Sequence, residues 1–580
     1  MNKVKEFFEK SRMEYEKLPQ VIEKKSAPIV EFPLMGNLVR FKKTFFELVT
    51  NNISALTLKI ISQVMANNKE DIDSYLSQPE ITEINGIPHL EWKAKSNLWD
   101  EKTYIIDIYP DGLLYKIKVK GTGTPTSIKY FCGSNSEKFP GSEYQASHFT
   151  YPVSQNATKN DLTFPVCNGG EISSLYMTPP PFMYPFSSEE FSGVVSVGLI
   201  AKEGEFNFKK FLLKYTQDRI HFELPLGGNK KVENEWETQA IWCGFNSDIF
   251  EAVKTYSDFH YNRNLAKHGP KEKLRWWKGP LYCGWGDHTS IGNVVYGDNF
   301  KCANQEFYSA ISDRIDELGL KPTAIIIDDK WQEEYGTMLP DKSKWPDLRK
   351  FTDEQHAKGR RVVLWLRAWK NDGLNSDECI TLNGKAICAD PTNPKYVKRI
   401  YDTFHTLLSS DEGCYNCDGF KIDFVDETVI VPGVKVYDES KYGLELMKEL
   451  LMLFYNAAKC AKSDALINNS VCHPYFAETT DQIRLHDYQS SLRNQMEVMT
   501  YRRDLYAAAI PNALIDTDSA CNDDYRNAKE YYLNAVKLGV PDIYKVFDPY
   551  YTNEFGFTDE DWAEIRTVWE EYSRKMDEEE

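Results

Sequence analysis

The sequence has few cysteines and no long apolar run. Its twelve cysteines are scattered irregularly over 580 residues, which is too sparse for a disulfide scaffold and is typical of reduced thiols. No uncharged apolar stretch approaches the roughly 20 residues that span a bilayer, and the first twenty residues lack the apolar core of a secretory signal. We therefore expect a cytoplasmic protein that does not bind membranes.

The sequence has a single CxxC motif, formed by Cys414 and Cys417. A tetrahedral zinc site needs four ligands, and no second pair follows at zinc-finger spacing. We interpret the two cysteines as ordinary loop thiols.

Basic residues are outnumbered, with 69 lysines and arginines against 87 aspartates and glutamates. The resulting formal charge of -18 repels polyanions, so nucleic acid is not an expected partner. Apolar residues make up 42% of the chain and aromatic residues 13%, values typical of a folded protein. The length predicts more than one domain.

Short β-type runs broken by Gly, Pro, Asn and Asp fill residues 28–250. In residues 114–119, Leu and Lys alternate with Tyr, Ile and Val, which predicts a strand with one wet face. We expect an N-terminal antiparallel β-sandwich domain over residues 1–265. It would begin with helical residues 1–25 and end in a linker helix from Ile249.

Beyond about residue 275, apolar strand-like runs alternate with longer amphipathic segments, as in parallel βα units. Eight such runs predict a (β/α)8 barrel, so the fold class is a multidomain sandwich plus barrel. We place this catalytic barrel at residues 266–580, with no C-terminal β-domain. The expected strands are 280–286, 323–329, 361–367, 418–424, 465–471, 482–487, 513–518 and 541–547.

Polar residues gather at the ends of five of these strands, where barrel enzymes place their chemistry. An Asp after a strand can instead cap the following helix, but five strands sharing the feature favour an active site. The residues are Asp328, Asp329, Arg367, Lys421, Asp423, Arg484, His486, Asp487, Asp516 and Asp518.

Asp423 and Asp487 are suited to glycoside hydrolysis, which needs two carboxyl groups flanking the scissile bond. Alternate strand ends lie about 10 Å apart, so the two groups could lean in to the roughly 5 Å of a retaining enzyme; inversion stays open. Lys421 precedes Asp423 by two residues and would share its face, keeping it ionised; a barrel-filling salt bridge is the alternative. Arg484 could pair with Asp423 or with a sugar hydroxyl.

Four tryptophans fall at or just after strand ends. Sugar rings present apolar C–H faces that stack on aromatic side chains, although large apolar residues more often fill the core. Trp285 and Trp365 are the preferred sugar contacts, ahead of Trp331 and Trp369.

The motifs GWG (with Cys283 and Trp285), IIIDDKWQ, GFKIDF and RLHD, in this order, resemble glycoside hydrolase family 36, especially its α-galactosidase and raffinose-synthase-like branches, and more distantly family 31. The resemblance implies that Asp423 is the nucleophile and Asp487 the acid/base. It also implies that Asp328 and Asp329 bind sugar hydroxyls, and it includes an N-terminal β-sandwich. Lys330 replaces a frequent Gly, and Leu485 and His486 replace a small pair.

The sequence therefore predicts a retaining, α-galactosidase-like glycosidase that acts on an oligosaccharide or other α-glycoside without a metal or other cofactor. Transglycosylation is an alternative reaction, and a sugar-binding protein without catalysis is an alternative function. For the assembly, a homo-oligomer stays open. A metal-dependent hydrolase is a further alternative, with Asp328, Asp329, His473, His486, Asp487 and Asp518 as ligands. The expected substrate-binding residues are Trp285, Asp328, Asp329, Trp331, Trp365, Arg367, Lys421, Arg484 and His486.

Overall fold

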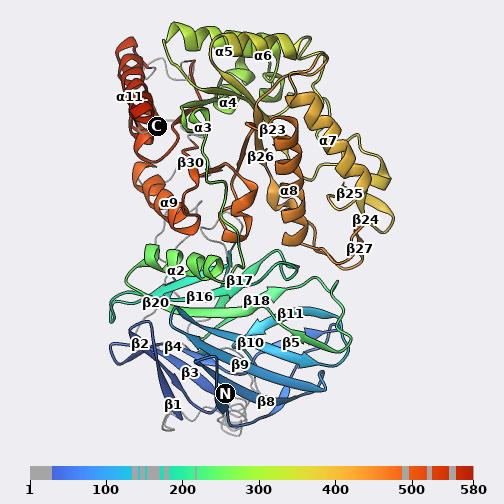
Figure 1. The fold of residues 1–580 in the computed structure, drawn as a ribbon, viewed down its shortest axis with the longest axis vertical. Helices are drawn as coiled ribbons and strands as arrows, with labels where there is room; N and C mark the ends of the chain where they lie inside the picture. Colours follow the sequence, from blue (N-terminus) through green and yellow to red (C-terminus); the bar gives the residue numbers. More distant parts are fainter. Residues whose placement is uncertain are drawn as a thin grey trace, which may run out of the picture.

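The chain folds into a lower part of antiparallel sheets and an upper barrel (Figure 1). The computed structural model describes residues 29–133, 142–143, 151–152, 170–174, 182–215, 219–485, 495–518, 525–547 and 557–578. The helix predicted for residues 1–25 lies outside these ranges.

Three antiparallel sheets form the N-terminal part, as predicted. The first contains β1 (Val30–Leu34), β2 (Asn37–Phe41), β3 (Phe45–Thr50) and β4 (Ile53–Lys59). The second contains β6 (Asp73–Leu76), β7 (Glu80–Ile84), β8 (Ile87–Ser96), β9 (Glu101–Tyr109), β10 (Gly112–Lys120), β13 (Tyr151–Pro152), β15 (Met183–Ser187), β16 (Val194–Ile200), β19 (Glu235–Glu237) and β20 (Ala240–Asn246). The third contains β5 (Gln63–Ala66), β11 (Pro125–Tyr130), β12 (Ser142–Glu143), β14 (Gly170–Ser174), β17 (Phe211–Tyr215) and β18 (Arg219–Pro225).

Strand β10 shows why these sequences form a sandwich. Tyr115, Ile117 and Val119 are fully buried, whereas Lys116 and Lys118 between them are partly exposed. Successive side chains of a strand point to opposite faces, so one face of β10 joins the core and the other meets water. The predicted alternation is confirmed.

Eight parallel strands form the barrel, in the order β30-β29-β28-β26-β23-β22-β21-β31. A parallel bridge between Asp516 and Val540 brings the two ends of this order together. A strand is present at each predicted place, but only β23 matches its predicted bounds and the other seven are shorter. The first ends early because a helix begins at Trp285. The strands are β21 (Leu281–Cys283), β22 (Ala324–Ile327), β23 (Arg361–Arg367), β26 (Gly419–Asp423), β28 (Leu466–Asn469), β29 (Gln482–Arg484), β30 (Leu514–Asp516) and β31 (Asp542–Ile543).

The predicted linker helix is α2 (Ile249–Asn262), which lies between the two parts (Figure 1). The other α-helices are α3 (Arg275–Lys278), α4 (Trp285–Val295), α5 (Gln305–Glu317), α6 (Leu348–Ala357), α7 (Pro394–Leu408), α8 (Leu444–Ala461), α9 (Gln495–Ala509), α10 (Tyr525–Asn534) and α11 (Asp559–Glu578). Short 3-10 helices are η1 (Asn299–Lys301), η2 (Ser376–Glu378), η3 (Val425–Glu427), η4 (Pro474–Thr479) and η5 (Ala535–Lys537). None of the described helices combines the length and apolar character needed to cross a membrane.

A small sheet of β24 (Cys379–Leu382), β25 (Lys385–Ala389) and β27 (Val434–Lys435) stands outside the barrel. It was not predicted. Asn383 and Gly384 join β24 to β25 with φ values of 50° and 76°, and an Asn-Gly pair is a strong hairpin signal because both turn residues need positive φ.

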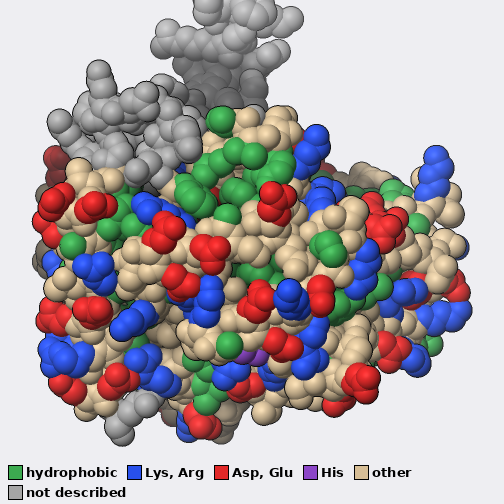
Figure 2. Space-filling view, turned by 90° about the horizontal axis from the view of Figure 1, so that it is seen from above, with side chains coloured by type: hydrophobic (Ala, Val, Ile, Leu, Met, Phe, Trp, Pro, Cys, Tyr) green, Lys and Arg blue, Asp and Glu red, His purple; other side chains and the backbone are tan. Residues whose placement is uncertain are grey.

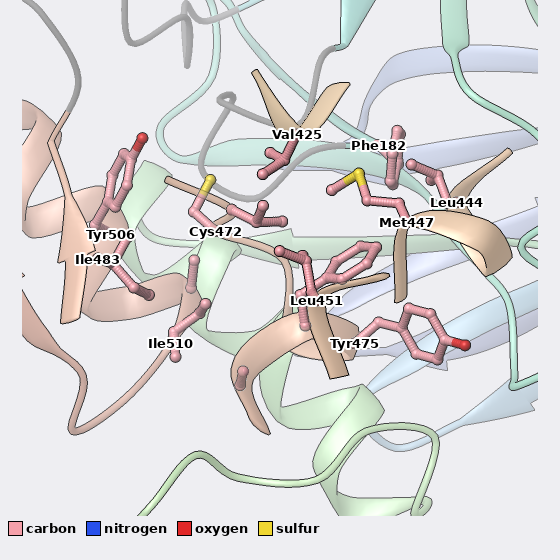
Figure 3. Packing of buried hydrophobic residues seen from close by; sticks show 14 of the residues in the cluster. Phe182, Val425, Leu444, Met447, Leu451, Cys472, Tyr475, Ile483, Tyr506 and Ile510 are labelled. Atoms are coloured by element: carbon pink, nitrogen blue, oxygen red, sulfur yellow. The ribbon is translucent and has the colours of Figure 1, made fainter. Parts of the chain in front are cut away.

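The sandwich and the barrel share a packed interface. In Figure 3, Phe182 of the sandwich lies beside Leu444 and Met447 of α8. The Glu445 carboxylate accepts hydrogen bonds from the backbone nitrogens of Gly204 at 2.7 Å and Phe206 at 2.9 Å.

Two further contacts hold this interface together. The ring of Phe206 stacks on Tyr475 of the barrel at 3.9 Å between centroids. Gly443 has φ 57°, and a Cβ there would lie 2.3 Å from the Phe208 carbonyl oxygen. Glycine thus allows the two backbones to approach, and the sandwich is a fixed support for the barrel.

Candidate active site

Residues from three strands, β21, β22 and β26, meet inside the barrel at its C-terminal end. The Lys421 ammonium of β26 lies 2.9 Å from Oδ2 of Asp328, which directly follows β22. The thiol of Cys283, at the end of β21, donates to the same oxygen at 3.0 Å. Burial favours the neutral acid, but Lys421 and Cys283 outweigh it and hold the pKa of Asp328 below its usual value. Asp328 is therefore a fixed, charged hydrogen-bond acceptor.

Tyr544, just after β31, links this cluster to the opposite side of the barrel. Its hydroxyl lies 3.3 Å from the Lys421 ammonium and donates to Asp518 at 2.6 Å. Asp518 follows β30, and the guanidinium Nε of Arg484 lies 3.7 Å from its Oδ2. Charged and polar groups thus form a connected chain across the barrel interior.

Asp423, the last residue of β26, stands at the open end of this chain. The guanidinium Nη2 of Arg484 lies 3.2 Å from Asp423 Oδ1, and the two side chains are 3% and 29% exposed. Burial disfavours charge on Arg484, but Asp423 and Asp518 raise its pKa above the usual value. A buried permanent cation therefore stabilises a carboxylate that solvent and substrate can reach.

The expected partner of Asp423 was Lys421, and this expectation is wrong. Lys421 and Asp423 do lie on one strand, but the Lys421 ammonium pairs with Asp328 after β22, two strands away, which is the barrel-filling salt bridge given above as the alternative. Period-two alternation fixes the face of the strand and leaves open which neighbour a long side chain reaches. Arg484, named only as an alternative partner, is the described cation that pairs with Asp423.

Trp331, Trp365 and Trp369 are all buried, and they differ in the groups that their indole nitrogens contact. The indole nitrogen of Trp365 lies 3.4 Å from Asp423 Oδ2. Trp331 has no exposed surface, and its indole nitrogen donates to the Trp365 carbonyl oxygen at 2.7 Å, so it supports Trp365. Trp369 is also buried and donates to the carbonyl oxygen of Val425.

Trp285 begins α4 directly after the short strand β21. Its ring is partly exposed and lies 6.3 Å from the ring of Phe300. The Trp285 side chain therefore lies at the C-terminal end of β21, where the chain enters α4.

Asp329 carries a hydrogen bond from the hydroxyl of Tyr335 at 2.8 Å. Burial raises the pKa of Asp329 to about 6, even though the bond from Tyr335 acts in the opposite direction. Two adjacent aspartates thus differ in character, since Asp328 stays ionised and Asp329 titrates near neutrality.

Arg367 lies between aromatic and acidic groups. Its guanidinium sits 4.0 Å above the ring of Phe424 and pairs with Glu427 at 2.7 Å. Phe424 directly follows Asp423 and is 38% exposed, so an apolar ring borders the carboxylate at the solvent side.

Four residues after the barrel strands have left-handed backbone conformations: Lys330, Trp369, Phe424 and Asp518, with φ values of 71°, 68°, 55° and 46°. Such conformations cost roughly 1–3 kcal/mol for residues other than glycine and gather at functional sites. The frequent Gly at the position of Lys330 in family 36 is consistent with this backbone.

Asp516, the last residue of β30, is a buried carboxyl group of the cluster. It accepts from the Asn468 amide at 2.7 Å, and burial together with the nearby Asp518 raises its pKa. Asp516 accepts a hydrogen bond from the backbone nitrogen of Asp518 at 3.0 Å, and its charge raises the pKa of Arg484. It therefore holds these two residues in place.

His486 and Asp487 lie outside the described residues, so their roles stay predictions. Strand β29 ends at Arg484, three positions before Asp487 in the sequence. The predicted acid/base therefore follows the strand that provides the cation for Asp423.

The metal-site alternative loses one of its ligands. His473 is buried at the interface between the two parts, with its ring 5.5 Å from Phe182 and 5.8 Å from Phe206. Its Nδ1 accepts from the backbone nitrogen of Tyr475. Within the described ranges, no three His, Cys, Asp or Glu side chains are grouped to hold a metal ion, and Cys414 and Cys417 are free thiols.

Sequence reasoning missed Tyr335, Phe424, Glu427 and Tyr544. Tyr544 lies inside the predicted strand 541–547, whereas the observed β31 ends at Ile543, so the predicted bounds hid Tyr544 from the strand-end rule. Tyr335 lies in a loop and Glu427 in the short helix η3, where spacing along the sequence carries no information on contacts.

No family model matches the sequence, and no curated protein matches it. Among solved structures, a variant of the family 36 α-galactosidase AgaA from Geobacillus stearothermophilus, in complex with stachyose, is 10% identical, with a TM-score of 0.54; the match covers 94% of this chain and 86% of that chain. The α-galactosidase AgaB from the same organism is 11% identical, with a TM-score of 0.52 and coverage of 94% and 85%.

A cycloalternan-degrading enzyme from Trueperella pyogenes is 12% identical, with a TM-score of 0.50 and coverage of 84% and 82%. The resemblance in sequence is thus matched in three dimensions. This chain has the sandwich-and-barrel fold of the family 36 α-galactosidases.

Proposed function

We propose that the protein is a retaining α-glycosidase that hydrolyses terminal α-linked sugars, with α-galactosides as the first class to test. The observation that carries this proposal is the pairing of Asp423 with Arg484 at 3.2 Å, at the end of the barrel where such enzymes act. The fold shared with α-galactosidases supports it. The choice of galactose rests on the family 36 resemblance.

In the proposed reaction, an Asp423 oxygen attacks the anomeric carbon and the bond to the leaving oxygen breaks. Asp487 gives its proton to that oxygen, and a glycosyl ester of Asp423 forms. Asp487 then takes a proton from water, which attacks the anomeric carbon and releases Asp423. Arg484 holds Asp423 in its charged form before attack and after release.

The sugar would lie against Trp365, with its hydroxyl groups on Asp328 and Asp329. Asp328 is fixed by Lys421 and Cys283, so it presents a preorganised acceptor. Asp329 accepts from Tyr335 and titrates near neutrality. Binding by such oriented groups lowers the entropic barrier to reaction.

We place the enzyme in the cytoplasm, because cysteines such as Cys243, Cys302 and Cys460 carry free thiols and such thiols persist in reducing compartments.

The test is a screen of nitrophenyl α-glycosides with the Asp423→Ala and Asp487→Ala variants. Asp423→Ala should abolish turnover of every substrate. Asp487→Ala should retain activity on substrates whose leaving group needs no proton. Asp402→Ala, at an exposed position of α7, is the matched control and should behave like the unaltered enzyme. Equal loss in both active-site variants on an activated substrate would contradict the assigned roles.

Transglycosylation is a second candidate, favoured by the exposed ring of Phe424 beside Asp423. With Arg367 above it, this ring offers a stacking surface on which an acceptor sugar could wait. Incubation of an α-galactoside with a large excess of acceptor sugar would yield a new oligosaccharide. If Phe424→Ala lowers the ratio of transfer to hydrolysis, the ring belongs to an acceptor site.

A further inference from the structure

A hollow of about 610 Å³ opens at the end of the barrel opposite the candidate active site. Ala513 and Leu514 line it at the start of β30, and Gly539 and Val540 line it just before β31. Parallel barrel strands all begin at one end and carry catalytic groups at the other. The hollow is therefore separate from Asp423, and its volume is in the range of small-molecule sites.

The charges around this hollow have one sign. Lys278, Arg503, Lys537 and Lys575 line it, and the described lining contains no Asp or Glu. Acidic residues outnumber basic ones 87 to 69 in the whole chain, and the face in Figure 2 shows both signs interspersed. Several like charges around a low-dielectric hollow concentrate the field and attract anions.

Two of these cations, Arg503 and Lys575, form ion pairs that are open to solvent. Arg503 contacts Asp504 at 2.7 Å and Lys575 contacts Glu571 at 2.9 Å, while Lys537 donates to the Asn534 side chain. Exposed pairs contribute under about 1 kcal/mol, so the anionic group of a ligand can replace either acid.

The floor of the hollow is apolar. Leu514, Val536, Leu538 and Met576 line it, and Tyr572 is its one aromatic side chain among the described lining residues. Sugar and nucleobase sites depend on stacking against several aromatic faces. The lining is better matched to a ligand with an apolar body and an anionic head.

A second hollow, of about 580 Å³, shares Ala513 with the first. Lys271 and Lys273 line it together with His268, and again the described lining contains no acid. The cationic surface thus continues past the first hollow along the same end of the barrel.

We propose that the hollow between β30, β31 and α11 binds a small organic anion with an apolar body, such as an alkyl or aryl phosphate. The anion would lie among Lys278, Arg503, Lys537 and Lys575, and the apolar body on the floor formed around Leu514. The same chemistry occurs in a free metabolite and in the head of an anionic lipid. The proposal is independent of the glycosidase activity.

Calorimetric titration of the full-length protein with hexyl phosphate tests the site, with hexanol and inorganic phosphate as the two half-ligands. We expect one molecule of hexyl phosphate to bind at least about tenfold more tightly than either half-ligand, and more weakly at high salt. Vesicles with and without anionic phospholipid distinguish a lipid source from a soluble one.

The decisive variant carries Lys537→Glu and Lys575→Glu, both at exposed positions. It should bind hexyl phosphate at least about tenfold more weakly, with unchanged circular dichroism and unchanged hydrolysis of a nitrophenyl glycoside. Lys395→Glu with Lys398→Glu, exposed on α7, is the matched control and should leave binding intact. Equal binding by both double variants, binding to anionic vesicles alone, or no binding would overturn the proposal.

Discussion

The Lys330 ammonium lies 3.9 Å above the centroid of the Tyr335 ring, while the Lys330 backbone is held at φ 71°. The same ring carries the hydroxyl that bonds to Asp329. The strained backbone of Lys330 and its cation over the Tyr335 ring therefore act together on the orientation of Asp329, one of the proposed sugar-binding residues.

Replacement of Lys330 separates these two effects. Lys330→Gly relieves the left-handed strain but removes the cation from the ring and adds freedom to the unfolded chain, each worth about 1 kcal/mol. One gain is thus set against two losses, so stability should fall by about 1 kcal/mol. Lys330→Val should lose about 2 kcal/mol, because a β-branched residue tolerates this conformation poorly. The midpoint of urea unfolding checks both, and equal effects of Gly and Val would exclude backbone strain as the cause.

Arg484→Met should lower kcat/KM on nitrophenyl glycosides by about 100-fold or more. Removal of one partner of a buried ion pair costs about 3–5 kcal/mol, and each 1.4 kcal/mol in the barrier is about tenfold in rate. Steady-state kinetics measure this loss. Arg349→Met, which breaks an exposed pair with Asp353, is the control and should leave kcat/KM unchanged.

Tyr544→Phe should destabilise the protein by about 1–3 kcal/mol, because Asp518 loses its 2.6 Å donor while staying buried. The change should also lower kcat/KM, since Lys421 contacts the Tyr544 hydroxyl and Arg484 contacts Asp518, which accepts from that hydroxyl. Urea unfolding and kinetics are measured on the same preparation. Tyr401→Phe, 38% exposed on α7, serves for comparison, and an equal response would deny Tyr544 a special role.

The pH dependence of stability should reveal Asp329. Its folded pKa of about 6 exceeds the usual Asp pKa of about 4, so between these pH values the folded protein holds a proton that the unfolded chain has released. Stability from this group is present below about pH 4 and is lost as pH rises through about 6. Asp329→Asn removes that loss, so the variant should gain relative stability between pH 5 and pH 8. The midpoint of urea unfolding at these pH values measures it, with Asp402→Asn expected to show no such gain.

The barrel was predictable because its strands are buried on both faces and therefore read as apolar runs. Residues 361–367 show this most clearly, since the predicted bounds match β23. Strand β21 was overestimated because GWG continues the apolar pattern while its backbone already turns into α4. A pattern of side chains predicts burial, and it does not report where the backbone changes direction.

The candidate site was predictable as a set of residues and less so as a set of contacts. Asp328, Lys421, Asp423 and Arg484 do meet at one end of the barrel. Their pairing depends on which strands are neighbours and on how far long side chains reach, and neither is encoded in spacing along the chain. For the same reason Tyr544, over a hundred positions from Lys421, was not connected with it.

Gly443 makes the interface between the sandwich and the barrel sensitive to substitution at a position that is not one of the proposed sugar-binding residues. A methyl group at this position would press against the Phe208 carbonyl oxygen of the sandwich. Two residues later, Glu445 Oε1 accepts hydrogen bonds from the backbone of that same segment. Even Gly443→Ala would therefore act as a wedge between catalytic and supporting halves. The mutational tolerance of the α8 start is set by a neighbour more than two hundred positions earlier in the chain.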